Sequence, residues 1–586
     1  MKKKKITSYF ANITPFQLAF LINALFLICY LISGTMKYEV SDDFMMEVMV
    51  SGAYTGTPSP YIMFMNPLIG LFLSTLYKLH ASLNWYFYFQ VAMIFLSLTG
   101  ITYLILKKKR TSFTLLLAVL FIGFFSNDLY QLMQFTKTAT VTIGCGCFFL
   151  ITAIVQKNIS YKRLLLGACY VLIGTMIRNK CFYITVAFLF LTCCLLFLRH
   201  LKQNQCSYKV MIKPLLIFAC TLGICYAFVY GSSKVFTSMH PDYAAYKEYN
   251  EARAIITDYP VDGYQNLKDD LSAIGVSEND FYNLAHFGYG DTQIYDADYV
   301  KQVSEIVAAH RLQDTPSILR IGYNMLKQRY DKYISVLGCL AIGLAVFIKK
   351  SRSFLLIFAN VLVTGVLLIY IFYQGRVVYR VEYSIFLSLA ISILCYDHFL
   401  TQEHTYPLER FLPAGIVILL LMHIPSFLPN THQNFAVMFN SWENHVGKYR
   451  ASFIDNRQEG ILQEMQQHPN RIYYLGFQTT IQTMYLNYDP RFVMEPNMFN
   501  NAIYLAGVDS FHPSRMQWLQ EHKLKGTMEE LLDKDVYLIE NIYQEEMLNF
   551  IKEHYDATAR LTQYAVIDGL ENRGKLKVVI FVTVLT

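Results

Sequence analysis

The chain has 586 residues, of which 54% are hydrophobic and 16% are charged, and its mean hydropathy is +0.30. Typical soluble domains have about 25% charged residues, so this composition excludes a wholly soluble protein and indicates one large membrane domain with sizeable soluble parts. The net charge of +7 comes mostly from short Lys/Arg clusters beside apolar runs, where such clusters set membrane topology, and it does not indicate a nucleic-acid partner. No disulfide framework is expected, because nearly all cysteines lie in or beside the apolar runs.

The chain begins with the basic sequence MKKKK and continues with an apolar run over 15–34, which is long enough to span the hydrocarbon core. No clear cleavage site follows, so a retained helix with a cytoplasmic N-terminus is predicted. The next apolar stretch, 61–79, contains Asn66-Pro67 near its middle, which weakens it as a spanning helix. If it did span, the basic cluster 107–110 would fall outside the cell. We therefore predict that 61–79 lies in the outer interface.

The remaining apolar runs and basic clusters then alternate across the membrane in agreement with the positive-inside rule. The chain is predicted to be an α-helical polytopic membrane protein with about eleven spans. These spans are 15–34, 84–106, 111–126, 137–156, 164–178, 181–198, 214–231, 333–348, 353–372, 382–398 and 411–428.

Two long polar segments remain, and both are predicted to be extracytoplasmic. The transmembrane domain is expected over 1–430, with a first outer loop at 35–83 that includes interfacial helices, and a large, helical outer loop at 232–332. The tail, 431–586, is expected to be a soluble α/β domain. Strand-like runs at 471–477, 535–540 and 577–585 alternate in it with helix-like runs at 453–468 and 543–555.

The first polar segment reads YEVSDDFMMEVMVSGAYTGTPSPY and contains the acids Asp42, Asp43 and Glu47. Asp43 and Glu47 are four residues apart, so on a short helix they share a face, and Asp42 is adjacent to them. A carboxylate near an apolar surface can have a raised pKa and serve as a general base. All three are candidate catalytic residues. The alternative is a solvated acidic turn just after a membrane helix.

Five basic residues are predicted at outer helix ends, against the bias that keeps Lys and Arg in the cytoplasm. A lipid-linked phosphate at the outer surface would explain them, because a guanidinium group matches phosphate oxygens. The alternative for each is a snorkelling anchor or an ion-pair partner, for example of Glu382. The candidate phosphate-binding residues are Lys137, Arg178, Lys180, Arg376 and Arg380.

Weaker candidates for contacts with a sugar or an acceptor lie in both outer loops. Tyr54 and Tyr61 could stack on a sugar ring, although aromatic residues near helix ends commonly form an interfacial belt. Glu251, Arg253 and Asp258 could contact the acceptor, or they could form local ion pairs within the large loop. No metal ligand is assigned. An acidic pair with few other oxygen ligands would hold Mg²⁺ or Mn²⁺ only weakly.

Together these features resemble the GT-C superfamily, the polytopic glycosyltransferases that use polyprenyl-phosphate sugars. The resemblance lies in the cytoplasmic N-terminus, the acidic pair in the first outer loop, the interfacial helices before the second span, and an arginine at an outer helix end, here Arg178. More narrowly, SDDFMMEVMVSGAYTG with a later NEARAIITDYP looks like a group of bacterial membrane proteins placed near these enzymes. The resemblance implies an inverting transfer with Asp42 as the base and Asp43 as a close second. The long outer loop and the α/β tail depart from the best-known members.

Three hypotheses follow for the function. The first is a plasma-membrane glycosyltransferase that moves a sugar from a polyprenyl-phosphate donor to an envelope glycan, a teichoic-acid-like polymer or a glycolipid. The second is a polysaccharide polymerase or ligase, which would use a lipid diphosphate donor and need no acid in the first loop. The third is a non-enzymatic flippase or scaffold. The spans are nearly free of charge, which disfavours transport of a polar solute, because transporters usually place ionisable groups near mid-membrane.

Overall fold

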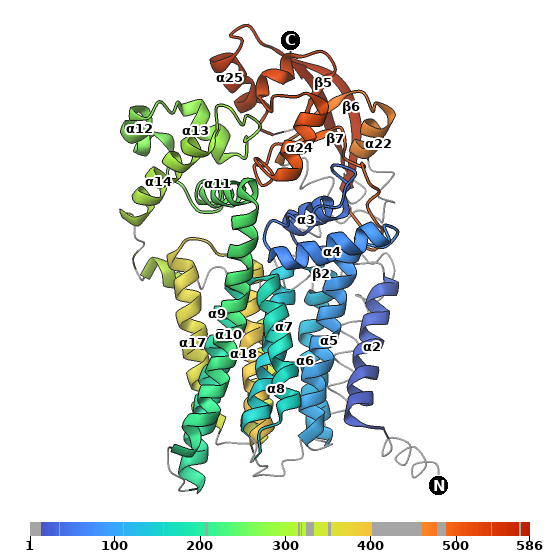
Figure 1. Cartoon of the computed structure of the whole chain (residues 1–586). Helices are drawn as coiled ribbons and strands as arrows, with labels where there is room; N and C mark the ends of the chain where they lie inside the picture. Colours follow the sequence, from blue (N-terminus) through green and yellow to red (C-terminus); the bar gives the residue numbers. More distant parts are fainter. Residues whose placement is uncertain are drawn as a thin grey trace.

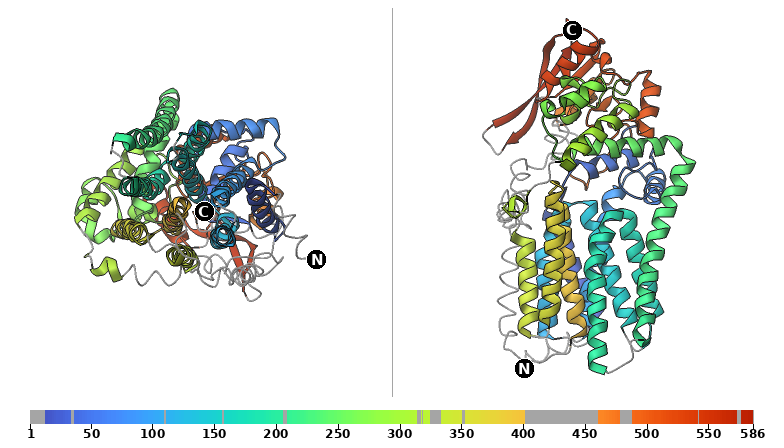
Figure 2. Two further views of the ribbon diagram at one scale, coloured as in Figure 1. Left: turned by 90° about the horizontal axis from the view of Figure 1, so that it is seen from below. Right: turned by 90° about the vertical axis from the view of Figure 1, so that its left-hand side faces the viewer.

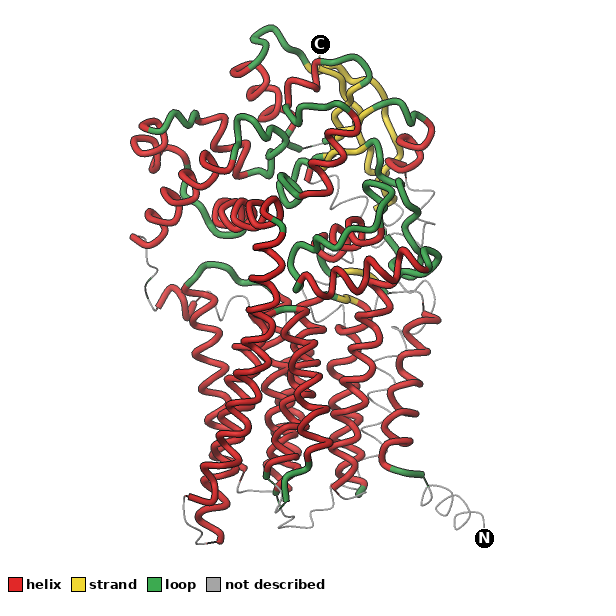
Figure 3. Tube along the Cα trace, in the orientation of Figure 1, coloured by secondary structure: helices red, strands yellow, loops and turns green. Residues whose placement is uncertain are grey.

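The computed structural model describes residues 13–33, 36–108, 111–155, 158–204, 209–313, 317, 319–323, 333–349, 353–400, 460–477, 488–540, 542–572 and 576–585. In this part of the chain, eight helices are long and apolar enough to cross a membrane. They run side by side as a bundle, and the loops and the C-terminal region gather at one end of it (Figures 1 and 3). This is the architecture of a multi-pass membrane protein. The eight are α2 (Pro15–Ser33), α5 (Trp85–Lys108), α6 (Ser112–Gln131), α7 (Phe135–Ile154), α9 (Asn179–Asn204), α10 (Lys209–Met239), α17 (Phe354–Tyr373) and α18 (Tyr379–Phe399).

Each of these helices overlaps one of the eleven predicted spans. Two further predicted spans, 164–178 and 333–348, coincide with α8 (Tyr161–Ile177) and α16 (Tyr333–Lys349), which have 17 residues each. The eleventh, 411–428, lies outside the described residues, as does the predicted domain boundary at residue 430. α7 is the centre of the bundle. All 20 of its residues are buried, because α5, α8, α9 and α18 pack around it.

The apolar stretch 61–79 is not one helix. Its second part forms α4 (Pro67–Leu79), which lies across the end of the bundle (Figure 1). Asn66 caps this helix by accepting the backbone N–H of Leu68, and proline is well suited to the first helical position. Asn66-Pro67 is therefore a helix start rather than a defect in a span. With 13 residues, α4 is too short to cross the hydrocarbon core.

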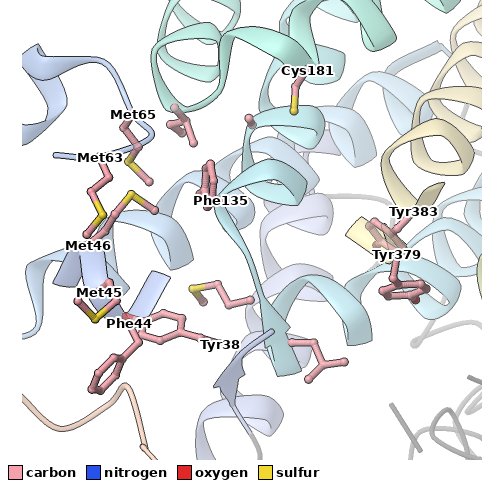
Figure 4. Close-up of a cluster of buried hydrophobic side chains, with 14 of the residues drawn as sticks. Tyr38, Phe44, Met45, Met46, Met63, Met65, Phe135, Cys181, Tyr379 and Tyr383 are labelled. Atoms are coloured by element: carbon pink, nitrogen blue, oxygen red, sulfur yellow. The ribbon is translucent and has the colours of Figure 1, made fainter. Parts of the chain in front are cut away.

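The predicted catalytic acids lie on α3 (Ser41–Ser51), of which nine of eleven residues are buried. Figure 4 shows Met46 of α3 with Met63 and Met65 of the following segment in one cluster of buried side chains. The helix ends at Gly52, whose φ of 83° is in the left-handed region that glycine adopts without strain. Just before α3, β1 (Lys37–Tyr38) pairs in parallel with β2 (Leu132–Met133) and joins the first loop to the start of α7.

The large loop begins where α10 leaves the bundle. α11 (Pro241–Thr257) turns away from α10 and lies across the end of the bundle (Figures 1 and 2). Proline at the first position of α11 allows this abrupt start, because a helix leaves that N–H unbonded. Three further helices pack beyond α11: α12 (Tyr264–Ala273), α13 (Glu278–Ala285) and α14 (Ala297–Gln313).

The C-terminal region contains a mixed five-stranded sheet in the order β4-β3-β5-β7-β6. β3 (Ile472–Leu475) is parallel to β4 (Ala502–Tyr504) and β5 (Val536–Ile539), whereas β7 (Leu576–Leu585) is antiparallel to β5 and to β6 (Leu561–Asn572). The helices of this region are α22 (Gly460–Gln467), α24 (Pro513–His522) and α25 (Gln544–His554). The three predicted strand runs correspond to β3, β5 and β7, while β4 and β6 were not predicted.

Backbone hydrogen bonds join the C-terminal region to both loops. The N–H of Phe499 donates to the carbonyl of Ala53 in the first loop, at 2.9 Å, and the N–H of Tyr289 in the large loop donates to the carbonyl of Leu505, at 3.0 Å. The Tyr246 hydroxyl of α11 donates to the carbonyl of Val508, at 2.7 Å. The region is thus packed onto the elements that surround the end of the bundle.

Candidate functional site

A cavity of about 710 Å³ lies where the bundle, the two loops and the C-terminal region meet. This volume is typical of pockets for small organic ligands. Residues of α3, the α8–α9 junction, α10, α11, the α17–α18 connection and the segment after β4 form its wall. Seven charged residues of the wall are basic and four are acidic, so the cavity favours an anion. They are Asp42, Arg178, Lys180, Lys234, Lys247, Glu248, Glu251, Arg253, Asp258, Arg376 and Arg380.

Asp42 is the first-loop acid that lines this cavity. It lies in the first turn of α3, where the positive end of the helix dipole stabilises a carboxylate. Its Oδ2 is 3.5 Å from Nη2 of Arg380, in the first turn of α18, and 25% of the Asp42 side chain is exposed. The structure therefore brings one predicted catalytic acid into contact with one predicted phosphate-binding residue.

Arg376 joins the α17–α18 connection to α11. Its Nη2 lies 2.6 Å from Oδ2 of Asp258, which caps the C-terminus of α11. The guanidinium also lies over the ring of Tyr259, 5.0 Å from its centre. Both interactions hold the far end of α11 against the bundle, and Arg376 and Asp258 both line the cavity.

Arg178 and Lys180 occupy the α8–α9 junction. The Arg178 guanidinium lies 5.1 Å from the ring centre of Phe135 and 5.7 Å from that of Phe64, and these aromatic faces attract a cation. Among the residues that the structure describes, no carboxylate forms an ion pair with Arg178 or Lys180. Cations that line a cavity without a carboxylate partner are available to an anionic ligand.

One face of α11 forms a further wall of the cavity. Lys247, Glu251, Ala254 and Asp258 are separated by four, three and four residues, so they share a helix face. Lys247 is not among the residues predicted from the sequence to bind a ligand, although its helical spacing from Glu251 is visible there. Some further wall residues come from segments distant from α11 in the sequence and have no local sequence signal. Among them are Phe287, Phe477 and Tyr504.

Asp43 does not line the cavity and is fully buried. Its Oδ1 accepts hydrogen bonds from the Tyr86 hydroxyl at 2.8 Å, the Gln90 amide at 2.9 Å and the backbone N–H of Phe135 at 3.2 Å. Its Oδ2 is buried without a hydrogen-bond partner among the described residues. Burial raises the pKa of Asp43 to about 7, although the three hydrogen bonds favour the charged form. Asp43 therefore fastens α3 to α5 and to the first turn of α7.

Glu47 also lies away from the cavity, on the buried side of α3. Its Oε2 accepts a hydrogen bond from the Tyr38 hydroxyl at 2.7 Å, and its Oε1 accepts one from the Tyr488 hydroxyl of the C-terminal region. Burial raises the pKa of Glu47 to about 8. The contact with Tyr488 makes Glu47 a link between α3 and the C-terminal region.

Lys137 is buried beneath the first loop and does not line the cavity. Its Nζ lies 2.6 Å from Oε2 of Glu39 and 2.6 Å from Oδ2 of Asp128, and it donates to the carbonyl of Leu132 at 3.1 Å. Because two carboxylates already neutralise this ammonium group, the structure gives no support to its predicted contact with a lipid phosphate. Lys137 instead ties the segment after β1 to α6 and α7.

The two tyrosines that were predicted to contact a sugar pack against other residues of the protein. Tyr54 is 1% exposed and stacks on Trp518 of α24, with ring centres 5.8 Å apart. The Tyr61 hydroxyl lies 3.1 Å from Nδ1 of His240, and its ring packs against Tyr243. Neither tyrosine lines the cavity, whereas the predicted acceptor residues Glu251 and Arg253 do.

Among the described residues, one group of carboxylate and imidazole side chains has the spacing of a metal site: Asp280, Glu553 and His554. Asp280 and His554 are already paired with each other, at 2.8 Å, and the Tyr295 hydroxyl donates to the same Asp280 oxygen. The group joins α13 to α25 and does not line the cavity. A divalent cation at the first-loop acids stays a prediction.

No protein-family model, curated protein or solved structure matches the chain. The resemblance to the GT-C superfamily therefore stays a prediction.

Proposed function

We propose that the protein is an inverting glycosyltransferase that moves a sugar from a polyprenyl-phosphate donor to a hydroxyl group of an envelope glycan, a teichoic-acid-like polymer or a glycolipid. One observation carries the proposal: Asp42 contacts Arg380 in a cavity whose wall also contains Arg178, Lys180 and Arg376. The cavity adjoins the ends of the apolar helices, where the phosphate of a membrane-bound donor would lie. It thus combines a proton acceptor with cations at the membrane boundary.

In the proposed reaction, the acceptor hydroxyl oxygen forms a bond to the anomeric carbon of the donor sugar, and the bond from that carbon to the phosphate oxygen breaks. The electron pair of the broken bond leaves with the polyprenyl phosphate. The proton of the hydroxyl group passes to the Asp42 carboxylate, which acts as the general base. Attack on the face opposite the phosphate inverts the configuration at the anomeric carbon.

The basic residues have two different tasks in this scheme. Arg178 and Lys180, which pair with no described carboxylate, bind the phosphate and stabilise the charge that grows on it as it leaves. Arg376 forms an ion pair with Asp258, and Arg380 forms one with Asp42. These pairs fix the positions of the two carboxylates relative to the phosphate. Preorganised charges of this kind need no rearrangement during the reaction.

We assign the base to Asp42 rather than Asp43 because Asp42 is partly exposed in the cavity, whereas Asp43 is buried and bonded to α5 and α7. Glu251 and Glu248 also line the cavity and are exposed. They belong to α11 and are assigned to contacts with hydroxyl groups of the acceptor.

We further propose that the cavity opens on the extracytoplasmic face of the plasma membrane, with the N-terminus in the cytoplasm. α2 begins at the bundle end opposite the cavity, and α5 ends there with Lys107 and Lys108 (Figure 1). Clusters of lysine beside membrane helices are retained on the cytoplasmic side. Labelling of single introduced cysteines in intact cells tests this orientation.

The decisive experiment measures sugar transfer by the full chain reconstituted in lipid, with a panel of polyprenyl-phosphate sugars as donors and cell-envelope material as acceptor. Asp42→Asn should lower transfer by about 10²- to 10⁴-fold, the usual contribution of a general base. Asp43→Asn is the matched control, because it makes the same change one residue away, and it should retain transfer within about tenfold of wild type. Binding of the donor lipid to both variants shows that they are folded.

Other results would change the assignment in defined ways. If Glu251→Gln abolished transfer while Asp42→Asn did not, the base would lie on α11. If transfer occurred only from lipid diphosphate oligosaccharides and survived Asp42→Asn, the protein would be a polymerase or a ligase. Absence of transfer from every lipid-linked donor, in a protein that binds those lipids, would favour a flippase or a scaffold.

A further inference from the structure

Arg253 is a buried guanidinium group in the wall of the cavity. It is 2% exposed, and its hydrogen bonds run to neutral groups: Nε donates to Oδ1 of Asn250 at 3.0 Å, and Nη1 donates to Oγ1 of Thr257 at 2.9 Å. No carboxylate lies within ion-pair distance of it in the described part of the chain, although the buried Asp509 carboxylate is close enough to interact with it electrostatically. A buried charge without a counter-charge is costly, so proteins keep one mainly where a partner or ligand compensates it.

The C-terminal region holds this side chain in place. Gly507, on the segment after β4, has a φ of 76°, and a Cβ atom built on it would lie 2.8 Å from Cδ of Arg253. The absence of a side chain at Gly507 therefore lets the backbone lie directly against the stem of the arginine. The guanidinium is fixed between α11 and the C-terminal region, and both of these contribute to the cavity wall.

Aromatic side chains from two distant segments also line the cavity. Phe287 follows α13 and Phe477 follows β3, and their rings stack with centres 3.7 Å apart and planes 13° from parallel. Phe287 has a φ of 68°, which is unfavourable for a residue with a side chain. Apolar ring surface beside a few fixed polar groups is the usual composition of a site for an organic ligand.

We propose that Arg253, Phe287 and Phe477 form an acceptor subsite for a saccharide that carries an anionic group, a carboxylate or a phosphate. This inference rests on the proposed transferase function and specifies its acceptor. The anionic group pairs with Arg253, which has no ion-pair partner among the described residues, and the sugar ring lies against the two phenylalanines. The donor phosphate binds separately at Arg178 and Lys180, on the α8–α9 junction. A neutral glycan leaves Arg253 without an ion-pair partner and binds more weakly.

Binding to the full chain in detergent, measured without any transfer step, tests the subsite. The probes are glucuronate, glucose 6-phosphate and glucose, which share a ring and differ in charge. Wild type should bind the two anionic sugars more tightly than glucose, and the stronger of the two identifies the carboxylate or the phosphate as the natural group. Arg253→Gln should weaken binding of the anionic sugars by about tenfold or more, because a charge-assisted hydrogen bond is lost.

Two further variants separate the subsite from a general effect of charge or folding. Lys268→Gln removes one exposed positive charge on α12, outside the cavity, and should leave all three affinities unchanged. Phe477→Leu keeps an apolar side chain but removes the ring. It should weaken the binding of glucose and of both anionic sugars by the same factor. If Arg253→Gln does not fold, Arg253→Lys replaces it. Lysine lacks the planar guanidinium group, so binding of the anionic sugars should still be weaker than in wild type.

Several results would overturn the proposal. These are equal binding of glucose and the anionic sugars by wild type, unchanged binding of the anionic sugars by the Arg253 variants, and unchanged sugar binding by Phe477→Leu. A polyprenyl phosphate probe completes the test, because Arg253→Gln should bind it as wild type does. Sugar binding that depends on Arg253, in a protein without transferase activity, would refute the proposed function and leave the subsite standing. Transfer that depends on Asp42 but not on Arg253 would support the proposed function and refute the subsite.

Discussion

The two sides of α3 show how similar charged residues take different tasks. On the buried side, Asp43 and Glu47 receive hydrogen bonds from tyrosine hydroxyls, and nearby Lys137 lies between two carboxylates. On the cavity side, basic residues outnumber acids, and Arg178 has no described carboxylate partner. The difference teaches that ionisable side chains buried among partners within the chain stabilise the fold, while those that line a cavity and stay partly exposed mark where a ligand binds.

Breaking the buried network should have the largest effect on stability. Lys137→Met leaves Glu39 and Asp128 facing each other without a cation, and such a change costs about 3 to 5 kcal/mol of unfolding free energy. Thermal or chemical unfolding in detergent measures it. The matched control adds Glu39→Gln and Asp128→Asn, which removes all three charges and should recover part of the loss. A stable Lys137→Met variant with weakened binding of polyprenyl phosphate would indicate that Lys137 binds the phosphate.

A pH series tests whether Asp43 belongs to the buried side. The folded chain keeps the proton of Asp43 up to a pH of about 7, whereas an unperturbed carboxyl releases it near 3.8. The folded state then binds more protons in this window, so stability falls as the pH rises through it, by at most about 1.4 kcal/mol per pH unit. Asp43→Asn cannot titrate, and it should show a shallower fall in unfolding free energy between pH of about 5 and about 7.

The remaining slope of Asp43→Asn should come partly from Glu47, whose pKa is about 8 in the fold. Lys268→Gln, which removes an exposed charge outside this buried network, serves as the control and should keep the wild-type slope. A wild-type stability that rises over this pH range would mean that Asp43 is charged in the folded protein, and the comparison between the two sides of α3 would fail.

Removing a basic residue from the cavity wall should weaken ligand binding without unfolding the chain. Arg178→Gln is expected to lower the affinity for a polyprenyl phosphate by about tenfold, because charge-assisted hydrogen bonds to the phosphate are lost. Its unfolding free energy should change little, since Arg178 pairs with no described carboxylate. Lys268→Gln, outside the cavity, is the control for charge. A large loss of stability with unchanged lipid affinity would place Arg178 with the buried residues.

The smallest effect is expected at Tyr54. Its hydroxyl group is buried and has no hydrogen-bond partner among the described residues, so Tyr54→Phe should change the unfolding free energy by no more than about 0.5 kcal/mol. Sugar transfer should also be unchanged, because Tyr54 stacks on Trp518 and does not line the cavity. Tyr54→Ala is the contrast, with an expected cost of about 3 to 5 kcal/mol. Reduced transfer by a stable Tyr54→Phe variant would contradict the placement.

Local properties of the sequence were sufficient to predict the bundle of membrane-spanning helices. Length and hydropathy identify a membrane span without reference to any other residue, and eight of the predicted spans correspond to long apolar helices. Asn66-Pro67 argued against a span over 61–79, although its role as the start of α4 was not predicted. Alternation in the tail indicated strands that correspond to β3, β5 and β7. β4 escaped prediction because it has only three residues, too few for a periodic pattern.

Only the tertiary structure decided what each charged residue does. Adjacent acids such as Asp42 and Asp43 have the same local sequence, and the direction of each side chain depends on what packs against α3. Glu47 meets Tyr488, 441 residues away, and Arg253 meets the backbone at Gly507. Whether a charge is neutralised inside the fold depends on such distant contacts, because electrostatic and hydrogen-bond partners are chosen by distance in space and not along the chain.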